Sequence, residues 1–264
     1  MAINKKNYFS QSNNLKYMGS SQFKSFMKCE AAALAEINGE WERPMSTALL
    51  VGSYVDSYFE GTLDEFKSEH PEIFNSRTGE LKADYKQADT IIKAIESDPL
   101  MMKYMSGKKQ VIKTGLIEGV PFKIKMDVYH KGKAIVDEKI MADFAPKYSP
   151  RHGRVVNFAE FWGYDIQAAI YQEIEKQHSK SDEKLPFFLV GATKQDIPDK
   201  AVIRMPQSLI DEQLEIVKAY APRFNDIKKG IIPPTRCESC AYCRATKKLD
   251  RVQDLIEFDA EIEL

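Results

Sequence analysis

The stretch KIKMDVYHKGKAIVDEKI, residues 123–140, decides the fold of this chain. It contains an apolar alternation that includes Asp127, a turn-like HKGK segment, and a second apolar run that closes with Asp137, Glu138 and Lys139. These features predict two antiparallel strands joined by a turn, which brings Asp127 and Asp137 into one neighbourhood. Asp137 and Lys139 lie two positions apart, so their side chains share a strand face and Glu138 points to the other.

Charges at the end of a buried strand are consistent with either a solvated strand tip or a metal site. Carboxylate oxygens suit Mg²⁺ and Mn²⁺, and such a cation polarises a phosphate and lowers the pKa of an attacking water. On geometry Asp137 and Lys139 form the catalytic pair. The Glu138 side chain lies outside it, although its backbone carbonyl can coordinate a metal. Short Asp-x-Lys triplets are common, so this triplet alone leaves both interpretations open.

The rest of the chain predicts helices first, then strands, then mixed elements. Helices are expected at residues 20–39, 46–61, 83–98, 158–178 and 208–230, and strands at 110–119, 120–130, 133–140, 185–193 and 200–206. The last helix is expected to bend near Pro222, and a loop-like segment follows it. This order favours an α/β fold with a mixed sheet flanked by helices. We expect one domain over 1–264, with a mainly helical part (1–105), a core (106–230) and a cysteine-containing tail (231–264).

Composition and charge narrow the function classes. The chain has 38 basic and 39 acidic residues and a formal net charge of −1, which gives no global signature of nucleic-acid binding but allows a local basic groove. No apolar run approaches the roughly 20 residues needed to span a bilayer. The first 14 residues lack the apolar core of a signal peptide, so we expect a cytoplasmic location. The sequence has no Gly-rich phosphate loop, which argues against an ATPase.

The ordered motifs resemble the PD-(D/E)XK nuclease superfamily, and within it the phage and prophage RecE-type exonucleases, which are related to RecB nuclease domains. IKMDVYH is similar to the family's acid strand, AIVDEKI to its (D/E)-x-K strand and YDIQAAIYQ to its Gln-x-x-x-Tyr helix. The resemblance implies a restriction-endonuclease-like core in which Asp127 and Asp137 hold metal and Lys139 positions or activates water. It also implies that Gln167 supports the lysine or a DNA phosphate and that Tyr171 contacts the substrate strand.

One motif departs from the family pattern. ALLVGSYVDSYFEG stands in the place of the family's Gly-x-x-x-His helix and carries Gly52 and Asp56 there. A carboxylate can ligate a hard cation, so the expected metal set is Asp56, Asp127, Asp137 and Glu138. The alternative is that Asp56 is an ordinary acid on a helix face.

The resemblance implies a Mg²⁺- or Mn²⁺-dependent DNA exonuclease that works at duplex ends. By analogy it processes ends 5′ to 3′ in phage-type homologous recombination, with a single-strand annealing protein as partner and a ring-like homo-oligomer. Three alternatives stay open: a structure-specific or restriction-type endonuclease on the same fold, a catalytically silent DNA- or protein-binding module, and a zinc-stabilised interaction protein.

Four cysteines form a second candidate site. RCESCAYC places Cys237, Cys240 and Cys243 at Cys-x-x-Cys-x-x-Cys spacing, and Cys29 lies far upstream. Such thiolates can bind an iron–sulfur cluster or Zn²⁺. The layout of one early and three late cysteines resembles RecB-like and CRISPR-adaptation nucleases with iron–sulfur clusters, but the late spacing is tighter than their Cys-x2-Cys-x5-Cys. The alternative is a set of reduced structural thiols.

A basic loop and the tryptophans complete the candidates. Lys147, Arg151 and Arg154 follow the acid strands in FAPKYSPRHGRVV, where they can approach a DNA backbone or simply face solvent. Trp41 and Trp162 are expected in the core rather than as stacking platforms for bases.

Overall fold

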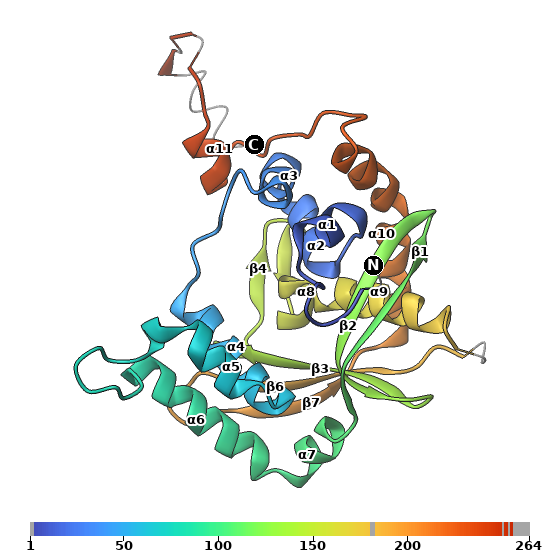
Figure 1. The fold of residues 1–264 in the computed structure, drawn as a ribbon. Coiled ribbons are helices and arrows are strands. Elements are labelled where there is room, and N and C mark those ends of the chain that lie inside the picture. Colours follow the sequence, from blue (N-terminus) through green and yellow to red (C-terminus); the bar gives the residue numbers. More distant parts are fainter. Residues whose placement is uncertain (1–2, 180–182, 250, 253, 256–264) are drawn as a thin grey trace.

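A five-stranded mixed sheet forms the centre of the molecule in the computed structural model, which describes residues 3–179, 183–249, 251–252 and 254–255 (Figure 1). Its strand order is β1-β2-β3-β6-β7. Strands β3 and β6 run parallel, and the other neighbouring pairs are antiparallel. The strands are β1 (Lys108–Ile117), β2 (Val120–His130), β3 (Ala134–Met141), β6 (Phe187–Thr193) and β7 (Lys200–Arg204). The predicted α/β fold with a mixed sheet and the predicted strand meander are confirmed.

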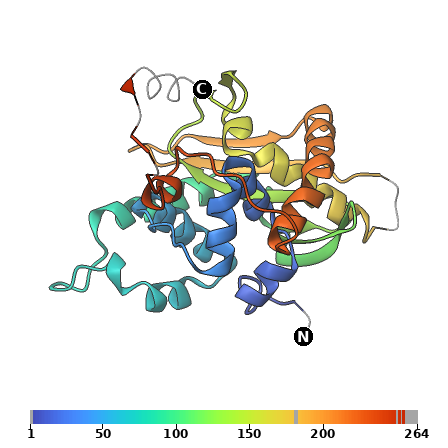
Figure 2. The same cartoon turned by 90° about the horizontal axis from the view of Figure 1, so that it is seen from above.

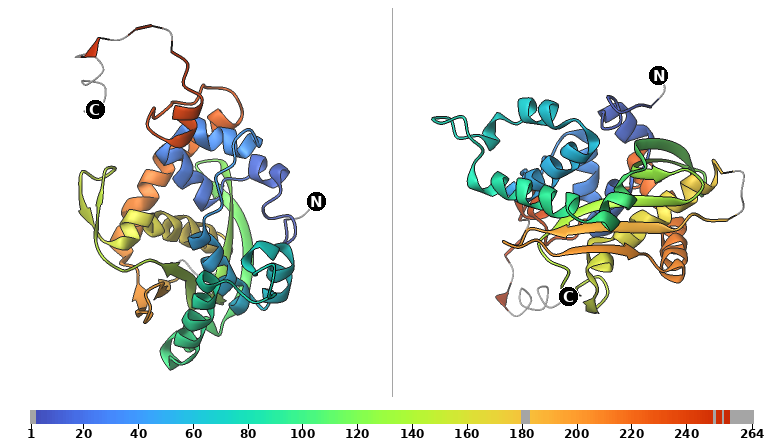
Figure 3. Two further views of the ribbon diagram at one scale, coloured as in Figure 1. Left: turned by 90° about the vertical axis from the view of Figure 1, so that its left-hand side faces the viewer. Right: turned by 90° about the horizontal axis from the view of Figure 1, so that it is seen from below.

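Helices cover both faces of this sheet and bury two apolar cores. On one face pack α2 (Ser20–Lys28), α3 (Glu30–Asn38), α8 (Phe158–Trp162), α9 (Tyr164–Lys176) and α10 (Gln207–Lys228). On the other face pack α4 (Thr47–Glu60), α5 (Leu63–Glu69), the 3₁₀ helix η1 (Pro71–Ile73), α6 (Ala83–Glu96) and α7 (Pro99–Met105). The view from below in Figure 3 shows the sheet between α4–α7 and the pair α9 and α10.

The strands β2 and β3 separate where the acids stand. Their pairing comprises Val128 with Val136, Tyr129 with Ile135 and His130 with Ala134. Continuing that register would place Asp127 directly across from Asp137, because each pair of residue numbers sums to 264. The ladder ends one step before this position. The carboxylates of Asp127 and Asp137 therefore lie just beyond the last paired residues, where β2 and β3 are no longer hydrogen-bonded as a ladder.

Strand β2 changes faces at Asp127. Met126 packs into the core beneath α9, whereas Val128 packs into the core beneath α4, although alternation would place both on one face. Gln110, which lies across from Asp127 in the register of β1 and β2, has a left-handed backbone with φ of 55°. Such a local irregularity increases strand twist, and it re-aims the side chain of Asp127.

Two predicted helices are each broken by one residue. The helix expected at 20–39 is divided at Cys29, whose backbone is extended (φ −162°, ψ 111°). The helix expected at 158–178 is divided at Gly163, which has φ of 67°. The expectation of two continuous helices was therefore wrong. Apolar periodicity continues across both breaks, so the sequence pattern gives no sign of them. By contrast, α10 runs through Pro222 as one helix.

Several short elements carry too little pattern to be predicted from sequence. They include α1 (Gln11–Lys16), a two-stranded sheet of β4 (Lys147–Ser149) and β5 (Arg154–Val156), and α11 (Ala241–Ala245) in the segment expected to be a loop. Figure 2 shows the segment that carries α11 returning to lie over the N-terminal helices. Among the described helices, none is long and apolar enough to cross a membrane.

Candidate active site

The acid residues open into a cleft of about 920 Å³. Its walls come from α2, α4, the ends of β2 and β3, and α9, together with residues from the N-terminal segment before α1. The sequence-predicted residues that line it are Asp56, Asp127, Asp137, Glu138, Lys139, Gln167, Tyr171 and Gly52. The fold thus gathers residues separated by more than 100 positions around one opening.

Asp137 is the most constrained of these side chains. It is buried on β3, where its Oδ1 accepts a hydrogen bond of 2.8 Å from Gln167 Nε2 and its Oδ2 forms an ion pair with Lys139 Nζ. Lys139 Nζ also donates to the carbonyl oxygen of Glu138 at 3.0 Å and lies 5.4 Å from the ring centroid of Tyr164. Gln167 therefore supports Asp137, whereas the resemblance assigned it to the lysine or to a DNA phosphate.

The opposite face of β3 carries a second part of the site. Glu138 points away from Asp137, as alternation predicts, but it lies beneath α4 in a small enclosed space that Asp56 and Asp127 also line. Asp127 Oδ2 accepts a hydrogen bond of 3.0 Å from the backbone NH of Glu138. Asp127 therefore stands between the two faces, and the site extends across β3 to include the Glu138 side chain.

Burial and mutual repulsion raise the affinity of these acids for protons. Burial, together with the charge of Asp127, raises the pKa of Asp56 to about 8. Burial raises the pKa of Asp137 to about 7, with a further contribution from Asp127 against the lowering effect of Lys139. Burial and the charges of Asp56 and Asp127 raise the pKa of Glu138 well above its ordinary range. Such crowded acids favour a cation that would replace the protons.

The acid set fits a hard divalent cation. Carboxylate oxygens are the ligands that Mg²⁺ and Mn²⁺ prefer, and Asp56, Asp127, Asp137 and Glu138 all line this cleft. Glu138 Oε1 is buried and has no hydrogen-bond partner among the described residues. Buried polar atoms are nearly always paired, so this oxygen is one that a bound ion would satisfy. Asp56, Asp127, Asp137 and Glu138 are the residues that could hold it.

Lys139 remains protonated in this setting. Burial lowers the pKa of its ammonium, but the charges of Asp137 and Asp127 outweigh burial and raise that pKa above its ordinary value. A protonated lysine donates hydrogen bonds and cannot accept a proton. The side chain can therefore orient a water molecule or neutralise a phosphate oxygen.

Tyr171 is anchored within the cleft wall. Its hydroxyl donates to the carbonyl oxygen of Lys125 at 3.0 Å, and its side chain is buried. It lies one helical turn beyond Gln167 on the same face of α9, as the spacing predicts. The contact fastens α9 to β2 beside Asp127.

Sequence reasoning missed most of the basic lining of the cleft. Lys24, Lys123, Lys125 and Lys194 join Lys139 around it, and they come from α2, β2 and the loop after β6. Burial and the charge of Lys139 lower the pKa of Lys24 to about 8. Isolated lysines at these distances in the sequence give no local signal, because only the tertiary fold brings them together.

An apolar rim borders the same cleft. Phe9, Leu49 and Trp162 line it and keep 69%, 60% and 43% of their surface exposed. The expectation that Trp162 belongs to the core was therefore wrong, because the break at Gly163 places this side chain at the surface. Trp41, by contrast, is half-buried and packs edge-to-face against Tyr242.

The predicted basic loop lies outside the cleft lining. Lys147 Nζ forms an ion pair with Asp143 at 3.0 Å, and Arg154 Nη2 forms one with Glu160 at 2.9 Å. Arg151 is exposed at the tip of the hairpin of β4 and β5. None of these three residues lines the cleft, and two of them have acidic partners, so their proposed contact with DNA stays a prediction.

The four cysteines come together at one place. The sulfur atoms of Cys29, Cys237, Cys240 and Cys243 all lie within 4.8 Å of one another. The grouping joins the junction of α2 and α3 to the segment around α11. The predicted juxtaposition of Cys29 with the late cysteines is thus present in the structure.

Comparison with known proteins places this arrangement in a family. Residues 19–246 match the family described as "PDDEXK-like domain of unknown function (DUF3799)". The chain belongs to this PDDEXK-like family. The match includes every acid of the cleft, together with Lys139, Gln167 and Tyr171. It confirms the resemblance to the PD-(D/E)XK superfamily.

A solved structure supports the same assignment along almost the whole chain. A protein from Eubacterium rectale, described as a "Putative exonuclease", shares 47% identity with this PDDEXK-like chain over 98% of it and 99% of that protein, with a TM-score of 0.93. A second structure, described as SSO0001, aligns at 15% identity over 87% of this chain and 97% of that one, with a TM-score of only 0.29. No curated protein matches the chain.

Proposed function

We propose that this PDDEXK-like protein is a divalent-metal-dependent DNA exonuclease that hydrolyses phosphodiester bonds at duplex ends. The observation that carries the proposal is the convergence of Asp56, Asp127, Asp137 and Glu138 with Lys139 in one lysine-lined cleft. The Eubacterium rectale protein of the same fold, described as a "Putative exonuclease", supports the choice of reaction.

Mg²⁺ or Mn²⁺ is the cofactor that the acid set favours. The residues that would hold it are Asp127 and Asp137, with Asp56 of α4 and Glu138 of β3 contributing from the other face of β3. A divalent cation, when bound, supplies positive charge to the scissile phosphate and acidifies water for attack. Asp56 thereby takes the place of the histidine that the family pattern carries at this helix.

The chain's own residues orient the reacting groups. Gln167 holds one oxygen of Asp137 at 2.8 Å, which leaves the other oxygen facing Lys139. Protonated Lys139 orients the attacking water through hydrogen bonds and offsets negative charge that develops on the phosphate. Without a bound cation, the charges of Asp137 and Asp127 raise the pKa of Lys139 and favour its protonated form.

The cleft lining accounts for the substrate class. Lys24, Lys125 and Lys194 place positive charge around the acids, as a polyanionic backbone requires. The exposed rings of Phe9 and Trp162 border the cleft and offer surfaces on which unpaired bases at a frayed end can stack. A duplex end thus suits the cleft better than a continuous duplex.

The more specific parts of the proposed function rest on the resemblance to RecE-type exonucleases. It comprises 5′-to-3′ digestion in phage-type homologous recombination, a single-strand annealing protein as partner, a homo-oligomer and a cytoplasmic location. Duplexes labelled at either the 5′ or the 3′ end test the polarity, because release of the 5′ label as mononucleotide at the start of the reaction is expected.

Paired substrates test exonuclease activity. With Mg²⁺ or Mn²⁺ the protein should degrade linear duplex and leave covalently closed plasmid intact. Asp137→Asn should abolish the activity, and Lys139→Ala should lower kcat about a hundred- to a thousandfold. Asp211→Asn is the matched control, because Asp211 pairs with Lys184 on the exposed side of α10, away from the cleft.

Each rival function has its own result. Nicking or linearisation of closed plasmid that depends on Asp137 would instead indicate an endonuclease. If the unaltered protein binds DNA but shows no cleavage that depends on Asp137, the protein is a catalytically silent binding module. Folding that requires zinc, without hydrolysis in any divalent cation, would indicate a zinc-stabilised interaction protein.

A further inference from the structure

The sulfur atoms of the four cysteines have the spacing of ligands to a single metal ion. Cys29 Sγ lies 3.6 Å from Cys243 Sγ, which lies 3.9 Å from Cys237 Sγ, and all four sulfurs lie within 4.8 Å of one another. Zinc–sulfur bonds of about 2.3 Å in a tetrahedron place neighbouring sulfurs about 3.8 Å apart. The observed separations bracket this value.

An iron–sulfur cluster fits this group of sulfur atoms less well. In a cubane, several irons and sulfides lie between the four cysteine ligands, so the thiolates stand farther apart than around one ion. The Cys-x-x-Cys-x-x-Cys spacing occurs both in zinc sites and in iron–sulfur proteins, so the short sulfur separations make the distinction. The geometry thus differs from the cluster-binding layout that the sequence resembles.

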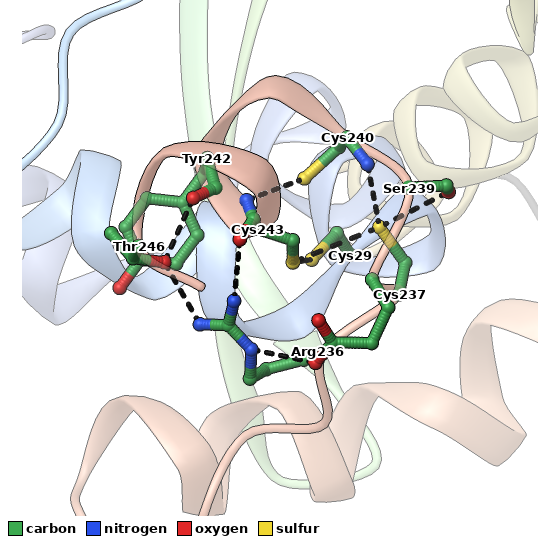
Figure 4. Close-up of polar contacts among 9 residues, drawn as sticks. Cys29, Arg236, Cys237, Ser239, Cys240, Tyr242, Cys243 and Thr246 are labelled. Carbon is green, nitrogen blue, oxygen red and sulfur yellow. Dashed lines mark hydrogen bonds and ion pairs between the residues drawn. The ribbon is translucent and has the colours of Figure 1, made fainter. Parts of the chain in front are cut away.

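The backbone around the cysteines is arranged to receive thiolates. The NH of Cys240 donates to Cys237 Sγ at 3.3 Å, and the NH of Cys243 donates to Cys240 Sγ at 3.4 Å (Figure 4). Arg236 adds a cation beside the group, since its guanidinium donates to the carbonyl oxygen of Cys243 at 2.7 Å. Such surrounding donors stabilise the charge of metal-bound sulfur.

Cys29 explains the break between α2 and α3. The two helices would continue into each other by periodicity, yet the extended backbone of Cys29 interrupts them. This residue is buried, and its sulfur faces the three late cysteines in Figure 4. The interruption therefore aims a ligand at the group.

We propose that Cys29, Cys237, Cys240 and Cys243 bind one tetrahedral Zn²⁺ that fastens the segment around α11 to the junction of α2 and α3. Zinc is chosen over a single ferrous ion because N- and S-donor sites bind Zn²⁺ more tightly than Fe²⁺. The ion links positions 208 residues apart (237 − 29). It also holds α2, whose Ser20, Ser21 and Lys24 form one wall of the catalytic cleft.

Hydrogen bonds of the neighbouring residue Glu30 also hold the junction of α2 and α3 to α10 and to the segment that leads to α11. Glu30 binds Arg223 of α10 through two hydrogen bonds of 2.7 and 2.8 Å and accepts one of 2.7 Å from the NH of Thr235. The segment thus has a second attachment next to Cys29. Loss of the ion should therefore loosen this corner without unfolding the central sheet.

Elemental analysis of the protein purified without added metal is the first test. We expect one zinc per chain, no acid-labile sulfide and no iron–sulfur absorption after anaerobic purification. Replacement by Co²⁺ should give the visible bands of a tetrahedral tetrathiolate. Iron with sulfide, iron alone, or an absence of metal with a Cys29–Cys243 disulfide or four freely reactive thiols would each overturn the proposal.

Variants assign the ion to the cysteines rather than to the acids. Cys240→Ser should lose the zinc and lower Tm by several degrees, because metal binding contributes folding free energy. Asp137→Asn and the matched control Ala245→Ser, on the exposed side of α11, should keep one zinc. Chelation of the unaltered protein, followed by Tm measurement, gives the same answer if Cys240→Ser fails to fold. Zinc retained by Cys240→Ser and lost from Asp137→Asn would contradict the assignment.

Discussion

Asp137 shows how one side chain is set for metal chemistry by its neighbours. Gln167 fixes one oxygen and Lys139 faces the other, while burial favours the protonated acid. A hydrogen bond from an amide favours the carboxylate and orients it, as donors behind metal ligands usually do. At this scale, the partner of Asp137 matters as much as the acid itself.

Removal of the Gln167 amide should weaken metal binding more than chemistry. In Gln167→Ala the concentration of Mn²⁺ for half-maximal activity should rise about 10- to 100-fold, because Asp137 loses the donor that orients it. Activity at saturating Mn²⁺ should change much less. Titration of activity with Mn²⁺ measures both. Gln177→Ala, on the exposed end of α9, is the control; an unchanged Mn²⁺ requirement in Gln167→Ala would contradict the role.

The raised pKa of Asp56 predicts a pH-dependent stability difference. The folded protein holds this proton up to about pH 8, whereas an unfolded aspartic acid releases it near pH 3.9. The free energy of unfolding of the metal-free protein therefore falls as pH rises between these values. Asp56→Asn removes this loss, so its Tm in EDTA should exceed that of the unaltered protein at pH 8.5.

The comparison at lower pH separates titration from a general effect. Near pH 4 Asp56 is mostly protonated in the folded state and about half protonated in the unfolded state, so the Tm difference should nearly vanish; at pH 6 it should be about half of that at pH 8.5. Added Mg²⁺ should reverse the order at pH 8.5, because it stabilises the ionised carboxylates of the unaltered protein. Asp84→Asn, on the exposed face of α6, is the control. A Tm difference independent of pH would contradict the prediction.

At the scale of elements, breaks in helices position the site. Gly163 ends α8 and begins α9, and it turns Trp162 outward while α9 carries Gln167 and Tyr171 into the cleft. In the same way, the extended backbone of Cys29 separates α2 from α3 and directs the Cys29 sulfur toward the late cysteines. Both breaks follow from backbone conformations that apolar periodicity does not encode.

Alanine at Gly163 should reduce DNA binding as well as stability. The backbone there has φ of 67°, so a side chain costs about 1–2 kcal/mol. An added Cβ would also lie 2.7 Å from Lys24 Cδ, which must move within the cleft wall. We expect affinity for duplex DNA to fall several-fold, measured by fluorescence anisotropy in EDTA.

Gly61 offers a matched control for this change. It ends α4 with φ of 77°, and no described atom lies within 4 Å of the position of an added Cβ. Gly61→Ala should therefore lose similar stability in urea unfolding but keep its DNA affinity. Equal affinities of the two variants would show that the Lys24 contact has no effect on binding.

At the scale of the whole molecule, charge is distributed rather than accumulated. Although the net charge of the chain is −1, the cleft is lined by five lysines and five acids. A cation at the acids would leave the cleft positive. Binding of DNA should therefore depend strongly on salt and on divalent cations despite the neutral composition.

Lysine variants should change this salt dependence. Lys125→Ala should weaken DNA binding and reduce the slope of log Kd against log salt by about one, if the lysine neutralises one phosphate. Lys184→Ala, which removes a surface partner of Asp211, should leave the slope unchanged. Arg154→Ala tests the hairpin of β4 and β5, and a larger effect there than at Lys125 would move the DNA path away from the cleft.

The sequence by itself determined the strand pair, the shared face of Asp137 and Lys139, and the helical spacing of Gln167 and Tyr171, because strand and helix periods fix such relations locally. Only the tertiary structure decided that Glu138 faces Asp56, that distant lysines line one cleft and that four cysteines meet. These relations depend on the separation of β2 from β3, on the packing of α4 beneath the sheet and on the breaks at Cys29 and Gly163. Long-range packing sets them, and no local pattern carries them.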